Sequence, residues 1–357
     1  YLRDVAQWQV WSNTLQPTLA PGSRFEATFT EPHVEFQRDD DGIETRTAIA
    51  VSPEDDIELR RVRLTNRSRT RRTIEATSYA EVVLERGVAD EMQRAFSNLF
   101  VETEIVHPRP AILCKRRPRS STEHWPWMLH LMTLHGADSM DTSFETDRLR
   151  FVGRGNSAAD PLALRQPGAL SGTQGAVLDP IVAIRHRFVL EPEQSVTLDI
   201  VTGVGESRAS CLTLVEKYQD LHLGDRVFDL AWTHSQVALR QINVSDAEAQ
   251  SYGRLAGRLL YANASLRADP KLIASNLRGQ SGLWGYAISG DLPIVLLQVK
   301  DQANIELVRQ LVKAHAYWRL KGLAVDLVIW NDDHGGYRQA FQEQILGFIA
   351  ASADSGL

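Results

Sequence analysis

The sequence predicts a β-rich α+β fold, in which an antiparallel β-sandwich precedes a helical connector and a small α/β layer. Three observations lead to this fold class. From Tyr1 to about Gly205, apolar residues recur with a period of two, and turn residues recur between the apolar segments. The period then becomes helical, and the last third of the chain alternates between strand-like and helix-like segments. We place the β-sandwich at 1–205, the helical connector at 206–270 and the α/β layer at 271–357, where the periodicity changes. A length of 357 residues suffices for about two domains, which the connector would join.

The segment 73–84 shows the two-residue period most clearly. Its apolar residues, such as Ile74 and Val82, fall on one face, and its polar residues, such as Glu75 and Thr77, fall on the other. We therefore expect one packed face and one wetter face. Because many strands of this kind follow one another, two stacked sheets are needed to hide their inner faces.

Two further patterns in this region predict local features. In 56–66 the parity of the apolar residues changes, which indicates a β-bulge near Arg60 and Arg61. In 188–200 two apolar segments flank the turn sequence Glu191-Pro192-Glu193-Gln194, which indicates a β-hairpin.

The helical connector is predicted from its capping residues and apolar stripes. Ser207 is placed to be the N-cap of a helix over 208–218, and a second apolar stripe runs over 227–238. Ser245 and Glu248 have the spacing of a capping box at the start of a third helix.

The α/β layer is predicted from two apolar strands and two helical segments. The strands are expected at 293–299 and 323–330, and the helices at 304–321 and 337–351. Both strands are apolar on both faces apart from Asp326, so we expect them to be parallel and covered by helices.

Composition and charge exclude several classes of function. A net charge of −6 with 24% charged residues is that of an ordinary surface and argues against a nucleic-acid partner. The basic cluster 115–119 is expected to be the solvated rim of a hairpin, with contact to phosphate or acidic lipid as the alternative. No apolar run approaches the roughly 18 residues of a membrane helix, so we expect no membrane contact by this segment. Cys114 and Cys211 lie in apolar patterns and are expected to be buried free thiols.

Several segments carry a resemblance to a known family. These are GQSGLWGYAISGDLPIVLLQV at 279–299, the segments 180–218 and 314–337, and WSNTLQPT at 11–18. Together they resemble the cyclic β-1,2-glucan synthases, and within these the first of two family 94 β-sandwich units, a galactose mutarotase-like supersandwich, with the α/β segment that follows it. The resemblance implies a piece of a longer, multi-pass membrane protein, with this piece itself soluble and on the cytoplasmic side of the inner membrane.

The resemblance also bears on activity. In family 94 an Asp in an (α/α)6 barrel acts as general acid while phosphate attacks the anomeric carbon, and the helices after Asp225 are too few for such a barrel. We therefore expect no catalytic residue, no metal and no cofactor, and an accessory region that binds β-1,2-glucan or another glucoside. The alternative is a structural spacer that docks the transferase and phosphorylase regions of the same polypeptide. A third hypothesis, an independent mutarotase-like enzyme, requires a pair such as His186 and Glu102.

Two aromatic groups are the candidate carbohydrate-binding residues. Trp284, Tyr286 and Asp291 form one group, and Trp125 and Trp127 form the other. A pyranose offers an apolar face for stacking and hydroxyls for hydrogen bonds, which suits this composition. In the alternative interpretation, the first two aromatic rings cover the sheet and the carboxylate caps a turn.

Two groups of residues invite a metal interpretation. His124, His130 and His135 lie close in sequence, but no Cys or carboxylate joins them at ligand spacing, so we expect structural histidines. The segment 331–336 follows the second parallel strand, where open α/β sheets commonly bind ligands. A metal or polyol is one hypothesis for this segment, and a plain turn at the start of a helix is the other.

Overall fold

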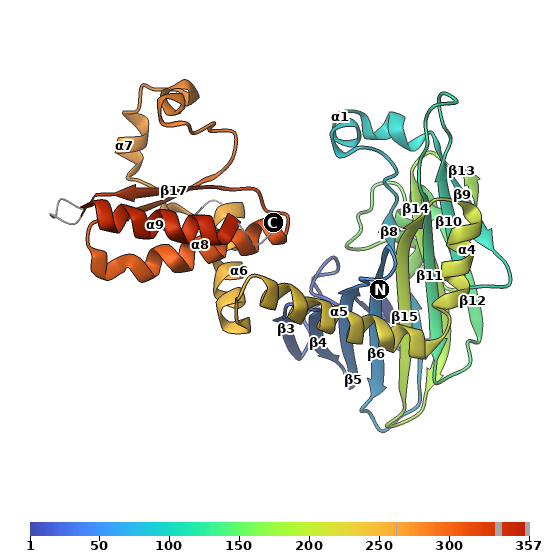
Figure 1. Ribbon diagram of the computed structural model, residues 1–357. Coiled ribbons are helices and arrows are strands. Elements are labelled where there is room, and N and C mark those ends of the chain that lie inside the picture. Colours follow the sequence, from blue (N-terminus) through green and yellow to red (C-terminus); the bar gives the residue numbers. More distant parts are fainter. Residues whose placement is uncertain (262, 333–337, 354–357) are drawn as a thin grey trace. The chain divides into compact units, whose positions relative to one another are not determined.

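The computed structural model describes residues 1–261, 263–332 and 338–353, and its chain divides into two compact units, Tyr1–Trp232 and Thr233–Leu357 (Figure 1). Helix α5 (Leu221–Gln241) contains the point of division. The domain boundaries that the sequence suggests, near 205 and 270, stay predictions.

Two antiparallel sheets form the first unit. Their strands are β1 (Leu2–Asp4), β2 (Gln9–Trp11), β3 (Arg24–Phe29), β4 (Val34–Asp40), β5 (Ile43–Val51), β6 (Ile57–Asn66), β7 (Arg72–Thr77), β8 (Ala80–Glu81), β9 (Val101–Val106), β10 (Ala111–Arg116), β11 (Trp127–His135), β12 (Asp141–Asp147), β13 (Gly175–Ala176), β14 (Pro180–Leu190) and β15 (Ser195–Gly205). The smaller sheet has the order β12-β14-β7-β1-β2, with β8 paired to β14. The larger sheet has the order β13-β9-β10-β11-β15-β6-β5-β4-β3.

The space between the sheets holds the main core of this unit. The smaller sheet contributes Trp11, Ile74 and Phe188, and the larger sheet contributes Ile112 and Leu198, to one cluster of buried apolar side chains. Burial of this kind stabilises the fold by roughly 25 cal/mol per Å² of apolar surface. The predicted antiparallel sandwich is confirmed.

The outer face of the larger sheet is covered by helix α4 (Arg208–Lys217). Its Cys211 and Val215 pack on a second apolar cluster that includes Leu129 and Val201 of the sheet. The Ser207 side chain accepts a hydrogen bond from the Ser210 backbone N–H, so the predicted N-cap is confirmed.

Burial on both faces explains the change of parity in 56–66. Ile57 and Leu59 belong to the outer cluster, whereas Val62 and Leu64 belong to the core between the sheets. Strand β6 pairs with β5 and β15 without a shift of register from Ile57 onward. The predicted bulge near Arg60 and Arg61 is therefore wrong. The strand is regular, and its apolar residues lie first on the outer face and then on the face toward the other sheet.

The predicted hairpin over 188–200 is also wrong. β14 belongs to the smaller sheet and β15 to the larger sheet, so the turn at 191–194 carries the chain from one sheet to the other. Asn66 holds this turn through two backbone bonds, since its N–H donates to the Gln194 carbonyl at 3.0 Å and its carbonyl accepts from the Glu193 N–H at 2.8 Å.

Part of the face of 73–84 that was expected to be wetter is buried, since Glu75 and Thr77 are buried whereas Tyr79 and Glu81 are half-buried. Glu75 and Thr77 are covered by a segment that contains α2 (Arg148–Val152) and α3 (Leu162–Arg165). Arg3 holds this segment by donating to the carbonyls of Leu164 at 2.8 Å and Gln166 at 2.9 Å, and its guanidinium also pairs with the Glu75 carboxylate. A second layer over the smaller sheet thus shields polar side chains that an open sheet would expose. The remaining helix of the unit, α1 (Gly87–Asn98), precedes β9.

The second unit contains the predicted α/β layer. Its elements are α6 (Asp246–Leu260), η1 (Ala264–Leu266), α7 (Pro270–Ala274), η2 (Gln280–Tyr286), β16 (Ile294–Val299), η3 (Gln302–Asn304), α8 (Ile305–Leu320), β17 (Asp326–Asn331) and α9 (Arg338–Ala353). The capping box of Ser245 and Glu248 is confirmed. β16 and β17 are parallel, as predicted, with Ile294 opposite Asp326.

One face of this small sheet differs from the prediction. Leu297 and Ile329 pack against α8 and α9 in an apolar cluster. On the opposite face, Leu296 and Trp330 are 58% and 53% exposed, so described residues do not cover both faces as expected. None of the described helices combines the length and apolar composition that a bilayer crossing requires.

Candidate functional site

A wide surface cleft of about 890 Å³ lies beside α4 in the first unit, and the predicted residue Trp125 lines it. We call it the Trp125 cleft. Its other lining residues are Glu54, Asp55, Asp56, His124, Pro126, Val204, Gly205, Glu206, Ser210, Thr213 and Leu214.

Three local features form the Trp125 cleft. The connection between β10 and β11 carries Trp125, and the turn between β5 and β6 carries Glu54, Asp55 and Asp56. Glu206 follows β15, and α4 carries the hydroxyls of Ser210 and Thr213. Gly205 allows α4 to approach β15, because a Cβ at this position would lie 2.7 Å from the Ser210 Oγ and 3.0 Å from the Cys211 Sγ.

Glu54, Asp55 and Asp56 form the acidic wall of the cleft, and basic side chains neutralise part of its negative charge. The Asp55 carboxylate accepts hydrogen bonds from Lys217 at 2.6 Å and from the Tyr218 hydroxyl at 2.5 Å. Burial raises the pKa of Asp55, but these hydrogen bonds outweigh it and hold the pKa below its usual value. Arg226 and Lys217 lower the pKa of Glu54 in the same way. The cleft is therefore lined by ionised carboxylates, aromatic surface and hydroxyls.

Trp125 and Trp127 occupy different environments. The half-buried Trp125 ring lies 5.1 Å from the Arg116 guanidinium and faces the cleft. Trp127 instead packs against the apolar cluster under α4, with the Lys115 ammonium 5.7 Å from its ring. Arg116 itself is buried and paired with Glu85 at 2.6 Å, so this member of the basic cluster is no solvated rim, contrary to expectation.

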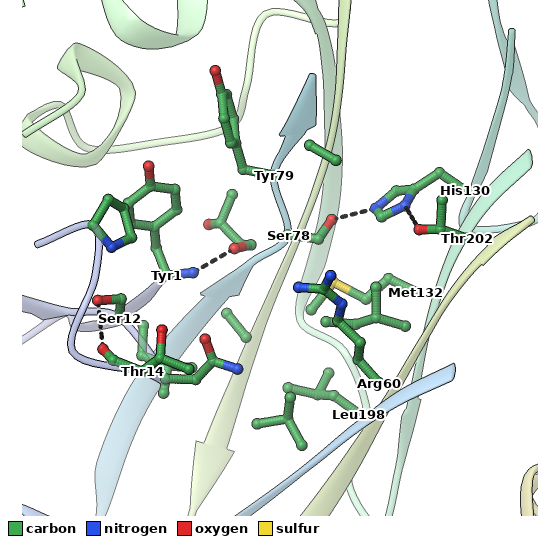
Figure 2. Close-up of a pocket in the computed structure, with 18 of the residues that line it drawn as sticks. Tyr1, Ser12, Thr14, Arg60, Ser78, Tyr79, His130, Met132, Leu198 and Thr202 are labelled. Carbon is green, nitrogen blue, oxygen red and sulfur yellow. Dashed lines mark hydrogen bonds between the residues drawn. The ribbon is translucent and has the colours of Figure 1, made fainter. Parts of the chain in front are cut away.

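A second hollow, the inter-sheet cavity, was not foreseen from the sequence. It has a volume of about 290 Å³ and lies between the two sheets (Figure 2). Its lining includes Ser12, Asn13, Thr14, Gln16 and Pro17 of the WSNTLQPT loop, with Tyr1, Leu2, Glu58, Arg60, Val62, Ala76, Thr77, Ser78, Tyr79, Ala80, His130, Met132, Leu198, Ile200 and Thr202. The WSNTLQPT motif was the one sequence signal that could have located it.

His130 forms part of the wall of the inter-sheet cavity. Its Nε2 lies 2.8 Å from the Ser78 Oγ and its Nδ1 lies 2.9 Å from the Thr202 Oγ1, so one ring nitrogen donates and the other accepts. Burial lowers the pKa of His130 to about 3, and the positive charge of Arg60 makes a smaller contribution in the same direction. The ring is therefore neutral at physiological pH and links the two sheets.

The predicted group of Trp284, Tyr286 and Asp291 lies on and after η2 in the second unit. Asp291 accepts hydrogen bonds from the Ser289 hydroxyl and, at 2.7 Å, from the Gln280 amide, and these bonds lower its pKa. The indole N–H of Trp284 donates to the Ser289 carbonyl at 3.3 Å. The carboxylate thus closes a turn, while the rings of Trp284 and Tyr286 are 64% and 74% exposed.

The structure does not join His186 to Glu102. The His186 Nδ1 lies 3.0 Å from the Thr142 hydroxyl, and its Nε2 lies 2.8 Å from the Met132 carbonyl. Glu102 pairs with Lys115 at 3.0 Å and with Arg117 at 3.3 Å. Both groups therefore have structural partners that occupy them.

Several of the residues considered for metal binding make hydrogen bonds to other side chains. The His135 Nε2 lies 3.1 Å from the Thr133 hydroxyl. Asn331 donates to the Gln342 side chain at 3.0 Å and Asp332 accepts from Gln298 at 2.7 Å, while 333–336 lie outside the described residues. Within 1–261, 263–332 and 338–353, no group of three or more His, Cys, Asp or Glu is placed to hold a metal ion.

Comparison with known proteins relates this chain to carbohydrate-active enzymes. It is 34% identical to "Cyclic beta-(1,2)-glucan synthase NdvB" of Rhizobium meliloti (strain 1021), over 97% of this chain and 12% of that protein. It is 27% identical to "N,N'-diacetylchitobiose phosphorylase" of Vibrio proteolyticus, over 66% of this chain and 28% of that protein. "Solabiose phosphorylase" of Paenibacillus borealis is 24% identical over 61% of this chain and 27% of its own length. The chain thus spans less than a third of each of these relatives.

A family model described as "Glycosyl hydrolase 94, supersandwich domain" matches residues 1–221. This range contains both antiparallel sheets and α4, the helix that covers the larger sheet. The chain therefore belongs to the glycosyl hydrolase 94 family, whose supersandwich domain forms its first unit.

Proposed function

We propose that this chain is a non-catalytic accessory region of a carbohydrate-active enzyme and that it holds a β-1,2-glucan or another glucoside in the Trp125 cleft. The observation that supports this most is the combination of an aromatic ring, carboxylates and hydroxyls around one open cleft. Its volume of about 890 Å³ lies within the range of about 300–1,000 Å³ that small-ligand sites occupy.

The chemistry of the Trp125 cleft suits a sugar chain. A pyranose ring can stack its apolar face on the Trp125 indole, while its hydroxyls donate to the carboxylates of Asp56 and Glu206. Lys217 already bonds Asp55 and lies against Glu54 at 3.4 Å, which reduces the repulsion within the acidic wall. A neutral ligand with many hydroxyls is therefore favoured over an anion.

Isothermal titration with sophoro-oligosaccharides tests this proposal. We expect millimolar or tighter binding, and a loss of about tenfold in affinity in Trp125→Ala, because stacking on an aromatic ring contributes about 1–2 kcal/mol. Trp330→Ala removes a tryptophan with an exposed ring from the other unit and is the matched control. No heat at millimolar ligand with the folded protein would remove the binding claim.

The predicted residues outside the cleft remain part of the proposal as a second contact. Trp284→Ala, Tyr286→Ala and Asp291→Asn test the second unit in the same titration, and Trp127→Ala tests the residue under α4. We expect the two aromatic changes in the second unit to remove a separate, second binding event and to leave binding at the Trp125 cleft unchanged, because their rings are exposed on the other unit. A titration that is unchanged in both variants would contradict a contact in the second unit.

A structural spacer is the second candidate function, and exposed apolar side chains in the second unit favour it. Leu277 is 97% exposed, and Leu266, Leu272 and Tyr286 are also largely exposed. All four lie within the segment 266–286, and exposed apolar surface of this kind marks protein contacts. The partner in this case is the remainder of a longer polypeptide, placed on the cytoplasmic side of the inner membrane as part of a multi-pass protein.

The spacer hypothesis makes a distinct prediction. A hydrophobic dye should bind the chain without sugar, and Leu277→Ser together with Leu272→Ser should remove most of that signal, while titration shows no glucoside binding. A dye signal unchanged in this double variant would argue against a docking surface at 266–286.

A further inference from the structure

We propose that the inter-sheet cavity is a second, separate binding site that takes a single neutral sugar ring of the hexopyranose class. The inference goes beyond the Trp125 cleft and does not depend on it, because the cavity lies between the two sheets whereas the cleft lies beside α4.

The burial of the lining residues gives the cavity a floor and a mouth. Met132, Leu198 and Val62 are almost fully buried and supply an apolar floor. Arg60 and Gln16 keep substantial exposure and mark the mouth. Figure 2 shows the Arg60 side chain between Met132 and Ser78, so its guanidinium borders the space that a ligand would fill.

A hollow of this size requires an occupant. Protein interiors are packed like organic crystals, and voids larger than a water molecule are few. The volume of about 290 Å³ exceeds that of a single water by far, and its polar wall of Ser78, His130 and Thr202 prevents it from being a dry apolar void. It holds either a group of waters or a small ligand that replaces them.

Charge selects a neutral ligand. The Arg60 Nε donates to the Glu58 carboxylate at 2.5 Å, so the mouth carries one positive and one negative group. The Glu58 carboxylate would repel an anion such as phosphate, and the Arg60 guanidinium would repel an ammonium group. A hydroxyl can accept from the guanidinium and donate to the carboxylate, so a polyol satisfies both partners.

Size and surface select a single ring. The cavity has about a third of the volume of the Trp125 cleft and lies at the lower limit of ligand sites. Its apolar floor at Met132 and Leu198 matches the apolar face of a pyranose, and the amides of Asn13 and Gln16 add donors and acceptors on the side of the WSNTLQPT loop. An oligosaccharide would have to leave its other rings outside the mouth.

Methyl NMR of the four methionines tests the proposal with D-glucose, sophorose and inorganic phosphate as probes. Met132 lies at the cavity floor, whereas Met92 and Met140 are exposed elsewhere and serve as internal controls. We expect about 50 mM glucose to shift the Met132 methyl signal, which Met132→Leu assigns, and to leave Met92 and Met140 unchanged. Arg60→Leu should weaken this response about tenfold without changing the melting temperature, because the side chain is half exposed.

Three outcomes would overturn the assignment. The first is a Met132 signal that does not move with either sugar in the folded protein, which would leave water as the occupant. The second is a response to phosphate without one to glucose, which would contradict the neutral ligand. The third is a glucose response that disappears in Trp125→Ala, which would make the two sites one. A failed oligosaccharide titration at the cleft leaves the Met132 response intact, so the two proposals fail separately.

Discussion

Glu75→Gln removes the anion at the centre of a buried cluster of arginines and should destabilise the first unit strongly. The Glu75 side chain is fully buried and pairs with Arg3 and Arg187, and Arg185 lies 3.8 Å away. Arg3 and Arg185 are themselves almost fully buried, so both guanidinium groups depend on this carboxylate for charge balance. Burial lowers the pKa of Arg185 to about 10, and the negative charge of Glu75 opposes that effect.

The magnitude follows from the burial of the partners. Removing one member of a buried ion pair costs about 3–5 kcal/mol, because the remaining charge keeps its desolvation penalty without compensation. Arg185 also donates to the carbonyls of Gly168 and Ala163 at 2.9 Å, so the segment over the smaller sheet should loosen together with the cluster. We therefore expect a loss of several kcal/mol rather than the small effect of a surface pair.

Urea unfolding at pH 7 measures this loss, with the transition of the first unit followed by far-ultraviolet circular dichroism. Glu193→Gln is the matched control, since Glu193 pairs with Arg67 on the surface at 3.0 Å and exposed pairs contribute little. An equal shift of midpoint in the two variants, or an unchanged midpoint in Glu75→Gln, would refute the reasoning.

Three other predictions concern stability and reactivity in the first unit. The folded state keeps His130 neutral down to a pKa of about 3, whereas the unfolded chain binds the proton below about pH 6.5, so stability is full above pH 6.5 and falls by about 1.4 kcal/mol per pH unit toward pH 3. Denaturation at pH 7, 5 and 4 should show this slope. A His130→Gln variant whose free energy of unfolding falls equally steeply with pH would contradict it. Gly203→Ala should lower the free energy of unfolding by about 1–3 kcal/mol, because its Cβ would contact Ile57 and lie 2.7 Å from the Asp56 carbonyl; unchanged stability would contradict the packing argument. The buried Cys114 thiol has a raised pKa and should react with a thiol reagent only after unfolding; fast reaction of the native chain would show that β10 opens.

Local hydrogen bonds made the helix starts predictable. Ser207 bonds an amide three residues ahead, and Ser245 and Glu248 satisfy each other's backbone, so the whole motif lies within four residues of sequence. The two buried cysteines were predictable for a similar reason, because one lies in an apolar strand pattern and the other in the apolar stripe of a helix.

The layer that covers a strand could not be predicted from its own residues. A period of two shows which side chains share a face, but it does not show what lies over that face. Leu59 packs in the cluster under α4, whereas Val62 packs in the core between the sheets. Glu75 is buried by a segment that lies 73 or more residues further along the chain. The turn at Pro192 has the chemistry of a hairpin, yet only the pairing of its strands with distant neighbours decides that they belong to different sheets.

The candidate site was only partly accessible to sequence reasoning for the same reason. Trp125 and Trp127 are two residues apart and chemically alike, but the first lies in the connection before β11 and the second within that strand. The strand places the Trp127 ring under α4, whereas the irregular connection leaves the Trp125 ring in the cleft. The inter-sheet cavity draws on residues from 1 to 202, so no window of the sequence contains it.

The same pair of strands contributes residues to both the cleft and the cavity. A substitution that tests one hollow without the other must therefore avoid these strands. β11 and β15 pair without interruption from Trp127 opposite Gly205 to His135 opposite Thr197. Together they supply His130 and Thr202 to the cavity, and the end of β15 supplies Gly205 to the cleft. A change within either strand would disturb both sites through a shared ladder of hydrogen bonds. Trp125 precedes β11, and Arg60 lies on β6, which pairs with β15. The Trp125 side chain lines only the cleft and the Arg60 side chain lines only the cavity, so a loss of binding in either variant reports on one hollow.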